Sequence, residues 1–109
     1  MGRIEQLLRL DNKVVLVTGG GRGIGKAICE MFDDAGAMVE VCDRDGRLAG
    51  DVAGSLQHGN AVCADISDEQ AVEAMFADVC ARRGRFDVLV HAAAIFPKRD
   101  FLTMTAAQW

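Results

Sequence analysis

The residues best suited to chemistry form a glycine-rich run, T-G-G-G-R-G-I-G, which extends from Thr18 to Gly25. Glycines let a backbone turn tightly and come close to a phosphate group. At the start of a helix such a run also gains free N–H groups and the positive end of the helix dipole, which favour an anion. The run lies between an expected strand and an expected helix. We therefore interpret it as a phosphate-binding loop rather than as a flexible turn.

Two other glycine motifs fit this run less well. A P-loop would match Gly20 and Gly25-Lys26, but the next residue, Ala27, lacks the hydroxyl group that holds magnesium. The strict dinucleotide pattern G-x-G-x-x-G, started at Gly21, would need its third glycine where the chain has a lysine. Both motifs are therefore set aside.

The loop must be positioned by strands and helices that alternate along the chain. Apolar, β-branched runs predict four strands, at Lys13–Thr18, Ala37–Asp43, Asn60–Ala64 and Phe86–Ala94. Apolar stripes with helical spacing predict three helices between them. The stripes are Ile24, Ala27, Ile28, Met31, Phe32 and Ala35, then Leu48, Val52, Ala53 and Leu56, then Val72, Met75, Phe76 and Val79. A capping box of Ser67 and Gln70 should open the third helix, and Thr103–Trp109 could begin a fourth.

This β-α-β-α-β-α-β order predicts an α/β fold in which residues 1–109 form one domain. Right-handed crossovers would arrange the strands of a doubly wound parallel sheet in the order 3-2-1-4. The crevice between the first and fourth strands, at their carboxyl ends, is then the expected ligand site. The fourth strand is apolar on both faces, as buried parallel strands are. We therefore expect an incomplete sheet with this strand at an open edge.

Composition and charge exclude several classes of protein. A net charge of −4 provides no basic field for nucleic acid. No apolar run approaches the length of a membrane span, and Arg9 interrupts the leucines near the N-terminus, so we expect a cytoplasmic protein with no membrane partner. The four cysteines are Cys29, Cys42, Cys63 and Cys80. Their spacing suits neither zinc nor a disulfide framework, so we expect buried free thiols and no metal site.

Four features, in order along the chain, resemble the short-chain dehydrogenase/reductase family, in its N-terminal cofactor-binding half. The loop fits the family pattern T-G-x-x-x-G-x-G, with threonine at Thr18. Asp43 ends the second strand and Asp65-Ile66 follows the third, where the family places its ribose-binding and adenine-binding acids. The segment D-V-L-V-H-A-A-A at 87–94 is similar to the family's D-x-L-V-N-N-A-G. The resemblance covers nearly the whole chain and implies a Rossmann-type, NAD(P)-binding domain of an oxidoreductase.

The resemblance also implies which residues bind the cofactor. They are Gly19, Arg22, Gly23, Ile24, Gly25, Asp43, Arg44, Asp65, Ile66, Ala92 and Ala93. A carboxylate at Asp43 favours NAD over NADP, because it can accept hydrogen bonds from the ribose hydroxyls and repels a 2′-phosphate. Arg22 and Arg44 could offset part of that repulsion, and Arg44 could instead stack on the adenine.

The family's catalytic group is absent from these residues. That family transfers hydride with a Tyr-x-x-x-Lys pair, a serine and usually an asparagine, whereas this chain contains no tyrosine. We therefore assign no catalytic residue and expect the chain alone, which would stop before the catalytic half, to be inactive. His91 and Ala92 replace two family asparagines and Ala94 replaces a glycine. We interpret His91 as a structural polar residue rather than as a catalytic base.

Three functional hypotheses remain open. The chain could be a segment of an NAD-linked oxidoreductase acting on a small-molecule alcohol or ketone, a free-standing nucleotide-binding module, or a nonfunctional truncated product. A complete parent could form a homo-oligomer. Only the loop Phe96–Phe101 could contribute to substrate specificity here, and its composition does not identify the substrate.

Overall fold

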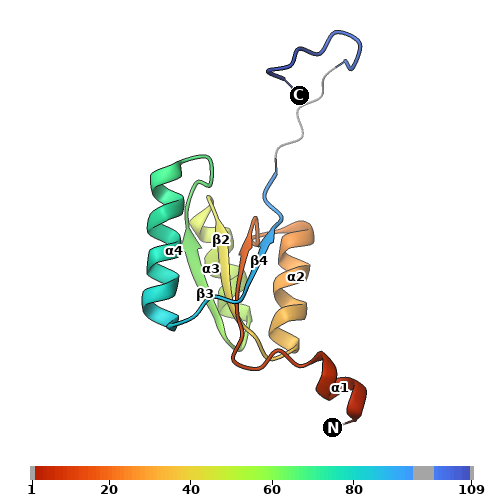
Figure 1. The fold of residues 1–109 in the computed structure, drawn as a ribbon, viewed down its shortest axis with the longest axis vertical. Helices are drawn as coiled ribbons and strands as arrows, with labels where there is room; N and C mark the ends of the chain where they lie inside the picture. The colour runs from red at the N-terminus through yellow and green to blue at the C-terminus, as the bar shows by residue number, and fades with distance from the viewer. Residues whose placement is uncertain (1, 95–99, 109) are drawn as a thin grey trace.

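Strands and helices alternate along the chain after a short first helix in the computed structural model, which describes residues 2–94 and 100–108 (Figure 1). The elements are α1 (Arg3–Leu8), β1 (Val14–Thr18), α2 (Gly23–Asp34), β2 (Met38–Asp43), α3 (Gly46–Ser55), β3 (Gly59–Cys63), α4 (Glu69–Arg83) and β4 (Val88–His91). All four predicted strands and all three predicted helices are present, with bounds shifted by a few residues. The helix α1 had no counterpart among the predictions.

The four strands form one parallel sheet in the order β3-β2-β1-β4, so the predicted doubly wound, Rossmann-type α/β fold is confirmed. Thr18 at the end of β1 pairs with Cys42 of β2 and with His91 of β4, and Asp43 pairs with Cys63 of β3. The carboxyl ends of the strands therefore lie together, and this end of the sheet is called the carboxyl edge below. Among the described residues only β1 pairs with β4, which leaves β4 at the edge with Leu89 50% exposed.

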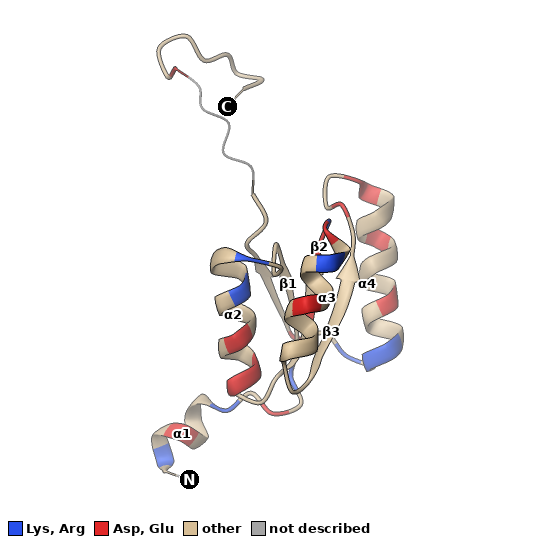
Figure 2. Cartoon of the chain, turned by 180° about the vertical axis from the view of Figure 1, so that it is seen from behind, with Lys and Arg blue, Asp and Glu red and all other residues tan. Residues whose placement is uncertain are grey.

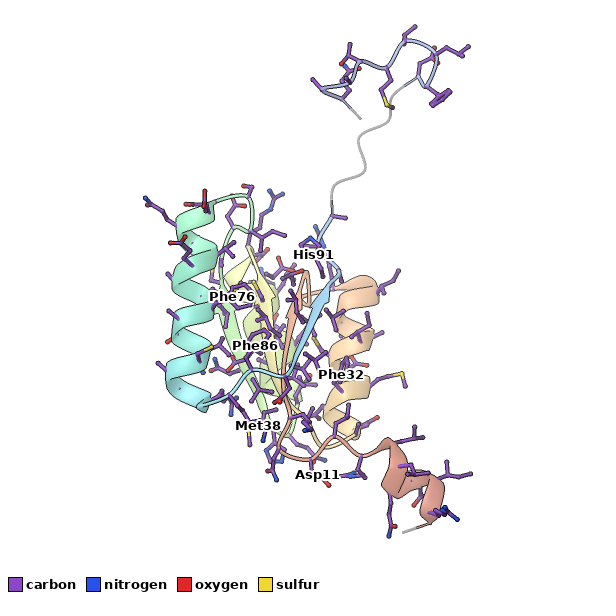
Figure 3. All side chains as sticks on the ribbon, viewed as in Figure 1. Asp11, Phe32, Met38, Phe76, Phe86 and His91 are labelled. Carbon is purple, nitrogen blue, oxygen red and sulfur yellow. The ribbon has the colours of Figure 1, made fainter. Side chains whose placement is uncertain are left out.

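The sheet has a buried cluster on each face because side chains alternate along a strand. Val15 and Val17 of β1 belong to the cluster that α2 and α3 cover, together with Cys29 of α2. Leu16, between them, belongs to the cluster that Met75 of α4 covers. Phe76 of α4 and Phe86 extend this second cluster with ring centroids 5.2 Å apart (Figure 3). Because both faces of the sheet are covered, a ligand can approach at the ends of the strands.

The apolar stripe predicted on α2 is only partly a core face. Ile28 and Phe32 pack against the cluster below α2, but Ile24 is 79% and Met31 73% exposed. The stripe, together with Leu10, instead lines an open apolar hollow of about 390 Å³. Helical periodicity identifies an apolar face but does not show that another element covers it.

Helix α4 begins one residue later than the capping box predicted. Its N-cap is Asp68, whose Oδ1 accepts the backbone N–H groups of Gln70 at 3.0 Å and Ala71 at 3.3 Å. Ser67 instead donates its hydroxyl to Asp65, at 2.7 Å. The predicted Ser67 box is therefore wrong: a carboxylate stands next in the chain, and carboxylates and hydroxyls cap helices about equally well.

The segment 100–108 contains turns and no helix, so the fourth helix considered there is not formed within the described residues. The loop Phe96–Phe101, considered for substrate specificity, lies mostly outside the described residues. Across the described ranges, 2–94 and 100–108, no helix combines the length and the apolar character needed to cross a lipid bilayer.

The four cysteines are free, as predicted, but only two are buried. Burial raises the pKa of the Cys29 and Cys42 thiols to about 11. Cys63, on the edge strand β3, and Cys80, on α4, are exposed, so the prediction of burial was wrong for these two. A position inside a helix or strand does not by itself place a side chain in the core.

A buried carboxylate ties α4 to the sheet. Glu40 of β2 is fully buried, and its Oε1 accepts hydrogen bonds from Arg82 at 2.9 Å and Arg83 at 3.0 Å. Its Oε2 accepts the side-chain amide of Asn60 at 2.8 Å. The two arginines form the basic end of α4, while acidic side chains mark the rest of that helix (Figure 2). This cluster fixes the C-terminal end of α4 against β2 and β3.

Candidate dinucleotide-binding site

The glycine loop turns from β1 into α2 at the edge where the strands end. Gly19 has φ of +68° and Gly23 has φ of +59°, a conformation that side chains disfavour. A Cβ built on Gly25 would overlap the carbonyl oxygen of Gly19, so the start of α2 can lie this close only with glycine there. Gly20 also donates its N–H to the carbonyl of Cys42, at 3.0 Å, which holds the loop beside β2. The predicted loop residues are therefore brought together as a tight backbone turn.

The N-terminus of α2 is arranged to receive an anion. Its N-cap residue, Arg22, makes no capping side-chain hydrogen bond within the described part of the chain, and the first turn carries no acidic residue. Arg22, Gly23 and Ile24 are exposed there, whereas Gly25 is buried. The N–H groups of a first helical turn point outward along the axis and carry partial positive charge. The side chain of Ile24 lines the apolar hollow of α2, so only its backbone N–H is available to an anion at this helix N-terminus.

Asp43 joins the glycine loop to the end of β2. Its Oδ2 accepts the N–H of Gly21 at 3.1 Å, and its Oδ1 accepts the N–H of Asp45 at 3.0 Å. A carboxylate has about four acceptor positions, so these two bonds leave capacity for further donors. The side chain is half-buried, and it lies directly beside the glycine loop. Asp43 thus has a structural role in holding the loop in addition to the ligand role that the sequence predicts.

Arg44 and Asp65 lie on the β3 side of this edge, and both are exposed. The Asp65 Oδ1 accepts the hydroxyl of Ser67 at 2.7 Å and its N–H at 3.0 Å. These bonds lower the pKa of the Asp65 carboxyl from its ordinary value, and the charge of Arg44 adds to the effect. Asp65 is therefore a fixed, ionised acceptor. Ile66 does not join it, because its half-buried side chain packs against the cluster under α4.

The opposite side of the site is the end of β4. Ala92 donates its N–H to the carbonyl of Thr18 at 3.2 Å, and Ala93 donates its N–H to the Thr18 hydroxyl at 3.3 Å. The backbone of Ala93 lies against Gly19: a Cβ on that glycine would be 2.7 Å from the Ala93 N and Cα atoms. Nδ1 of His91, near the tip of β4 in Figure 3, is 3.1 Å from the Thr18 hydroxyl.

The predicted site residues therefore lie around the carboxyl ends of the strands. They are the glycine loop, the N-terminus of α2, Asp43, Arg44, Asp65 and Ala92–Ala93. This is the switch point between β1 and β4, where doubly wound sheets bind ligands. The described residues include no cluster of three or more His, Cys, Asp or Glu side chains placed to hold a metal ion. The arrangement can bind an anion, two adjacent hydroxyl groups and an amino-bearing ring.

One carboxylate has a structural role that the sequence did not predict, at the end of the sheet opposite the site. Asp87, just before β4, accepts the N–H of Val14 at 2.8 Å and hydrogen bonds from the guanidinium of Arg85, also at 2.8 Å. The Arg85 bond, with the Val14 bond, lowers the pKa of the Asp87 carboxyl to about 2. These contacts fasten the starts of β1 and β4 together, and their register places Thr18 beside His91. Its place as the charged first residue of the D-V-L-V-H-A-A-A segment, inside the predicted strand Phe86–Ala94, was the signal that could have indicated this role.

Comparisons with known proteins agree with this geometry. The chain is 38% identical over 104 residues to the meso-2,3-butanediol dehydrogenase of Serratia marcescens, covering 94% of this chain and 41% of that protein. The crystal structure of a hydroxysteroid dehydrogenase from Escherichia coli superposes with a TM-score of 0.84 at 36% identity, over 92% of this chain and 44% of that one. A 3-ketoacyl-(acyl-carrier-protein) reductase from Brucella melitensis, complexed with NADH, gives 0.79 at 34% identity, over 91% and 41%.

The chain thus spans about two fifths of the length of the relatives it matches. The family model described as short chain dehydrogenase matches residues 13–109, which includes every element from β1 onward. This chain belongs to the short-chain dehydrogenase family.

Proposed function

We propose that this chain is the dinucleotide-binding part of an NAD-linked oxidoreductase that acts on a small-molecule alcohol or ketone. The observation that carries the proposal is the N-terminus of α2, which has no side-chain cap among the described residues and which the glycine loop places beside the carboxylate of Asp43. An anion bound at the helix would have its neighbouring sugar within reach of an acceptor. The family membership and the NADH complex of the Brucella relative support the same assignment.

The residues of the site fit such a cofactor. The pyrophosphate would meet the N–H groups of Gly23 to Gly25, and the ribose hydroxyls would donate to Asp43. Asp65 would accept from the adenine amino group, and Arg44 would lie along the adenine. The backbone of Ala92–Ala93 would line the path towards the nicotinamide. When bound, the cofactor accepts or supplies the hydride, and this chain's residues hold it in place.

The site should prefer NAD over NADP. NADP places a phosphate of about −1.5 to −2 charge where Asp43 lies, and one like-charge pair at about 4 Å costs about 4 kcal/mol at an effective dielectric of 20. Arg22 and Arg44, both exposed at this edge, would offset part of that repulsion. We expect a net preference of about 2–3 kcal/mol, or about 30- to 150-fold in the dissociation constant. Titration with NADH and NADPH, followed by nicotinamide fluorescence, measures it.

Two variants separate the charge of Asp43 from its role in the loop. Asp43→Asn keeps an oxygen that can accept the Gly21 or Asp45 N–H but loses the charge. It should therefore bind NADPH more tightly than the unmutated chain does. Asp43→Ala removes the acceptors as well and should weaken binding of both dinucleotides. Equal or tighter binding of NADPH by the unmutated chain would show that the arginines dominate and that NAD is the wrong assignment.

The 109-residue chain should not turn over an alcohol or a ketone with either dinucleotide. Proton transfer to or from a substrate oxygen needs a positioned acid or base. The chain has no tyrosine, and among the described residues the side-chain partner of His91 is the Thr18 hydroxyl. The measurement is nicotinamide absorbance over hours with a panel of alcohols and ketones, at protein concentrations above the dissociation constant. Turnover that co-purifies with the chain and is lost in a binding-deficient variant would contradict the expectation.

A further inference from the structure

His91 contacts a hydroxyl group that also holds the backbone of Ala93, and none of the proposed cofactor contacts accounts for this arrangement. Its Nδ1 is 3.1 Å from the Thr18 hydroxyl oxygen, and the same oxygen accepts the Ala93 N–H at 3.3 Å. A threonine hydroxyl has one proton and two lone pairs. If the proton goes to His91 Nδ1, a lone pair is directed at the Ala93 N–H. The imidazole is then neutral with its proton on Nε2, and the hydroxyl is held in one orientation.

This orientation matters because Thr18 connects the two walls of the site. Ala93, held by the hydroxyl, lies against the backbone of Gly19, where there is no room even for a Cβ. The carbonyl of Gly19 in turn lies where a Cβ on Gly25 would be, at the start of α2. A small displacement of Ala93 is therefore transmitted to the loop and the helix N-terminus, because no empty space between these close-packed backbone segments can absorb it.

We propose that His91 is a positioning residue for the dinucleotide, acting through the Thr18 hydroxyl to hold Ala92–Ala93 against Gly19. This inference rests on the proposed function, because its consequence is tighter cofactor binding. Removing the acceptor at position 91 leaves the Thr18 hydroxyl to rotate and costs part of two hydrogen bonds. Since single hydrogen bonds of this kind contribute modestly, the expected loss of NADH affinity is about three- to tenfold.

The experiment compares three substitutions of His91 by NADH titration, each below its own unfolding temperature. Asn places an amide oxygen at about the position of the imidazole Nδ1, so His91→Asn should bind within about twofold of the unmutated chain. His91→Gln places its amide beyond that position, and His91→Leu has no acceptor. Both should lose about three- to tenfold. Unchanged binding by His91→Leu, or failure of His91→Asn to restore it, would overturn the proposal.

A double-mutant cycle tests whether the effect passes through Thr18. Thr18→Val removes the hydroxyl at nearly constant shape. In that background His91→Leu should cause no further loss, because the group it acts on is gone. A full additional loss would show that His91 acts on the cofactor or on packing instead, and the proposed role would be wrong.

A measurement without cofactor distinguishes failure of this inference from failure of the proposed function. Amide hydrogen exchange at Ala93 should be faster in His91→Leu than in the unmutated chain, and restored in His91→Asn. If no NADH binds but this pattern appears, the cofactor assignment fails while the link from His91 to Ala93 stands. If exchange at Ala93 is the same in all three chains, the link itself is refuted, whatever the cofactor result.

Discussion

Gly25→Ala is expected to weaken NADH binding by at least about 100-fold, equivalent to about 3 kcal/mol. The new methyl group would overlap the carbonyl oxygen of Gly19, and both atoms belong to backbone that cannot move aside as a side chain can. The first turn of α2 would have to separate from the loop, and its N–H groups would no longer converge on one anion. NADH titration measures the loss, and circular dichroism with thermal unfolding shows whether the fold remains.

Gly50→Ala is the matched control. Gly50 lies inside α3, and a Cβ there would have no atom within 4 Å. Alanine should leave NADH affinity unchanged and stabilise the helix by up to about 1 kcal/mol. If Gly25→Ala folds and binds NADH within threefold of the unmutated chain, the glycine loop is not the anion site that we describe.

Glu40→Ala is expected to lower the free energy of unfolding by about 3 kcal/mol. The substitution leaves Arg82 and Arg83 without their buried partner and removes the acceptor of Asn60. The value is at the lower end for a broken buried pair because the two arginine side chains are 36% and 23% exposed. Urea denaturation followed by circular dichroism measures it. Asp78→Ala is the control, because this exposed partner of Arg82 should contribute less than about 1 kcal/mol.

The contribution of Glu40 should also depend on pH. Burial by itself raises the pKa of its carboxyl, but the hydrogen bonds from Arg82, Asn60 and Arg83 outweigh burial and leave the pKa below its ordinary value. A carboxyl with a lowered pKa in the folded state contributes stability that is complete above its unfolded pKa and is lost as the pH falls through the folded one. The stability difference between the unmutated chain and Glu40→Gln should thus be constant from pH 7 to about pH 5 and shrink below about pH 4. A difference that grows on acidification would contradict this account.

Much of the fold could be predicted because local pattern and global topology agree. The β-branched runs, the glycines at the turns and the right-handed crossover rule together determine the order β3-β2-β1-β4. The same topology brings Asp43, Asp65 and the glycine loop to one edge, although they are separated along the chain. The predicted N-cap was wrong because Ser67 and Asp68 are adjacent and both are good N-cap residues. The exposure of Met31 was not predictable because helical periodicity does not show whether another element packs on an apolar face.

The side-chain links of the site could not be predicted in the same way. Glu40 and its arginine partners are 42 and 43 residues apart, and Thr18 and His91 are 73 apart. Such pairs depend on strand register, which a single sequence specifies only through the fold as a whole. Asp43 was correctly placed at the end of its strand. Its bond to Gly21, however, depends on the path of the loop, which residue spacing does not give.

The most direct test of the central claim, that a dinucleotide binds at the carboxyl edge of the sheet, uses two exposed cysteines. Cys63 ends β3 beside Arg44, whose carbonyl accepts its thiol at 3.5 Å, and it pairs in register with Asp43. Cys80 lies near the C-terminal end of α4, towards the amino ends of the strands, and serves as the internal control.

The measurement is the rate of alkylation of each cysteine, followed by mass spectrometry, with and without NAD. At NAD concentrations ten times the dissociation constant we expect modification of Cys63 to slow about tenfold, since only the unbound fraction reacts, and that of Cys80 to be unchanged. Equal rates at Cys63 with and without saturating NAD, or equal slowing at both cysteines, would contradict the proposed site.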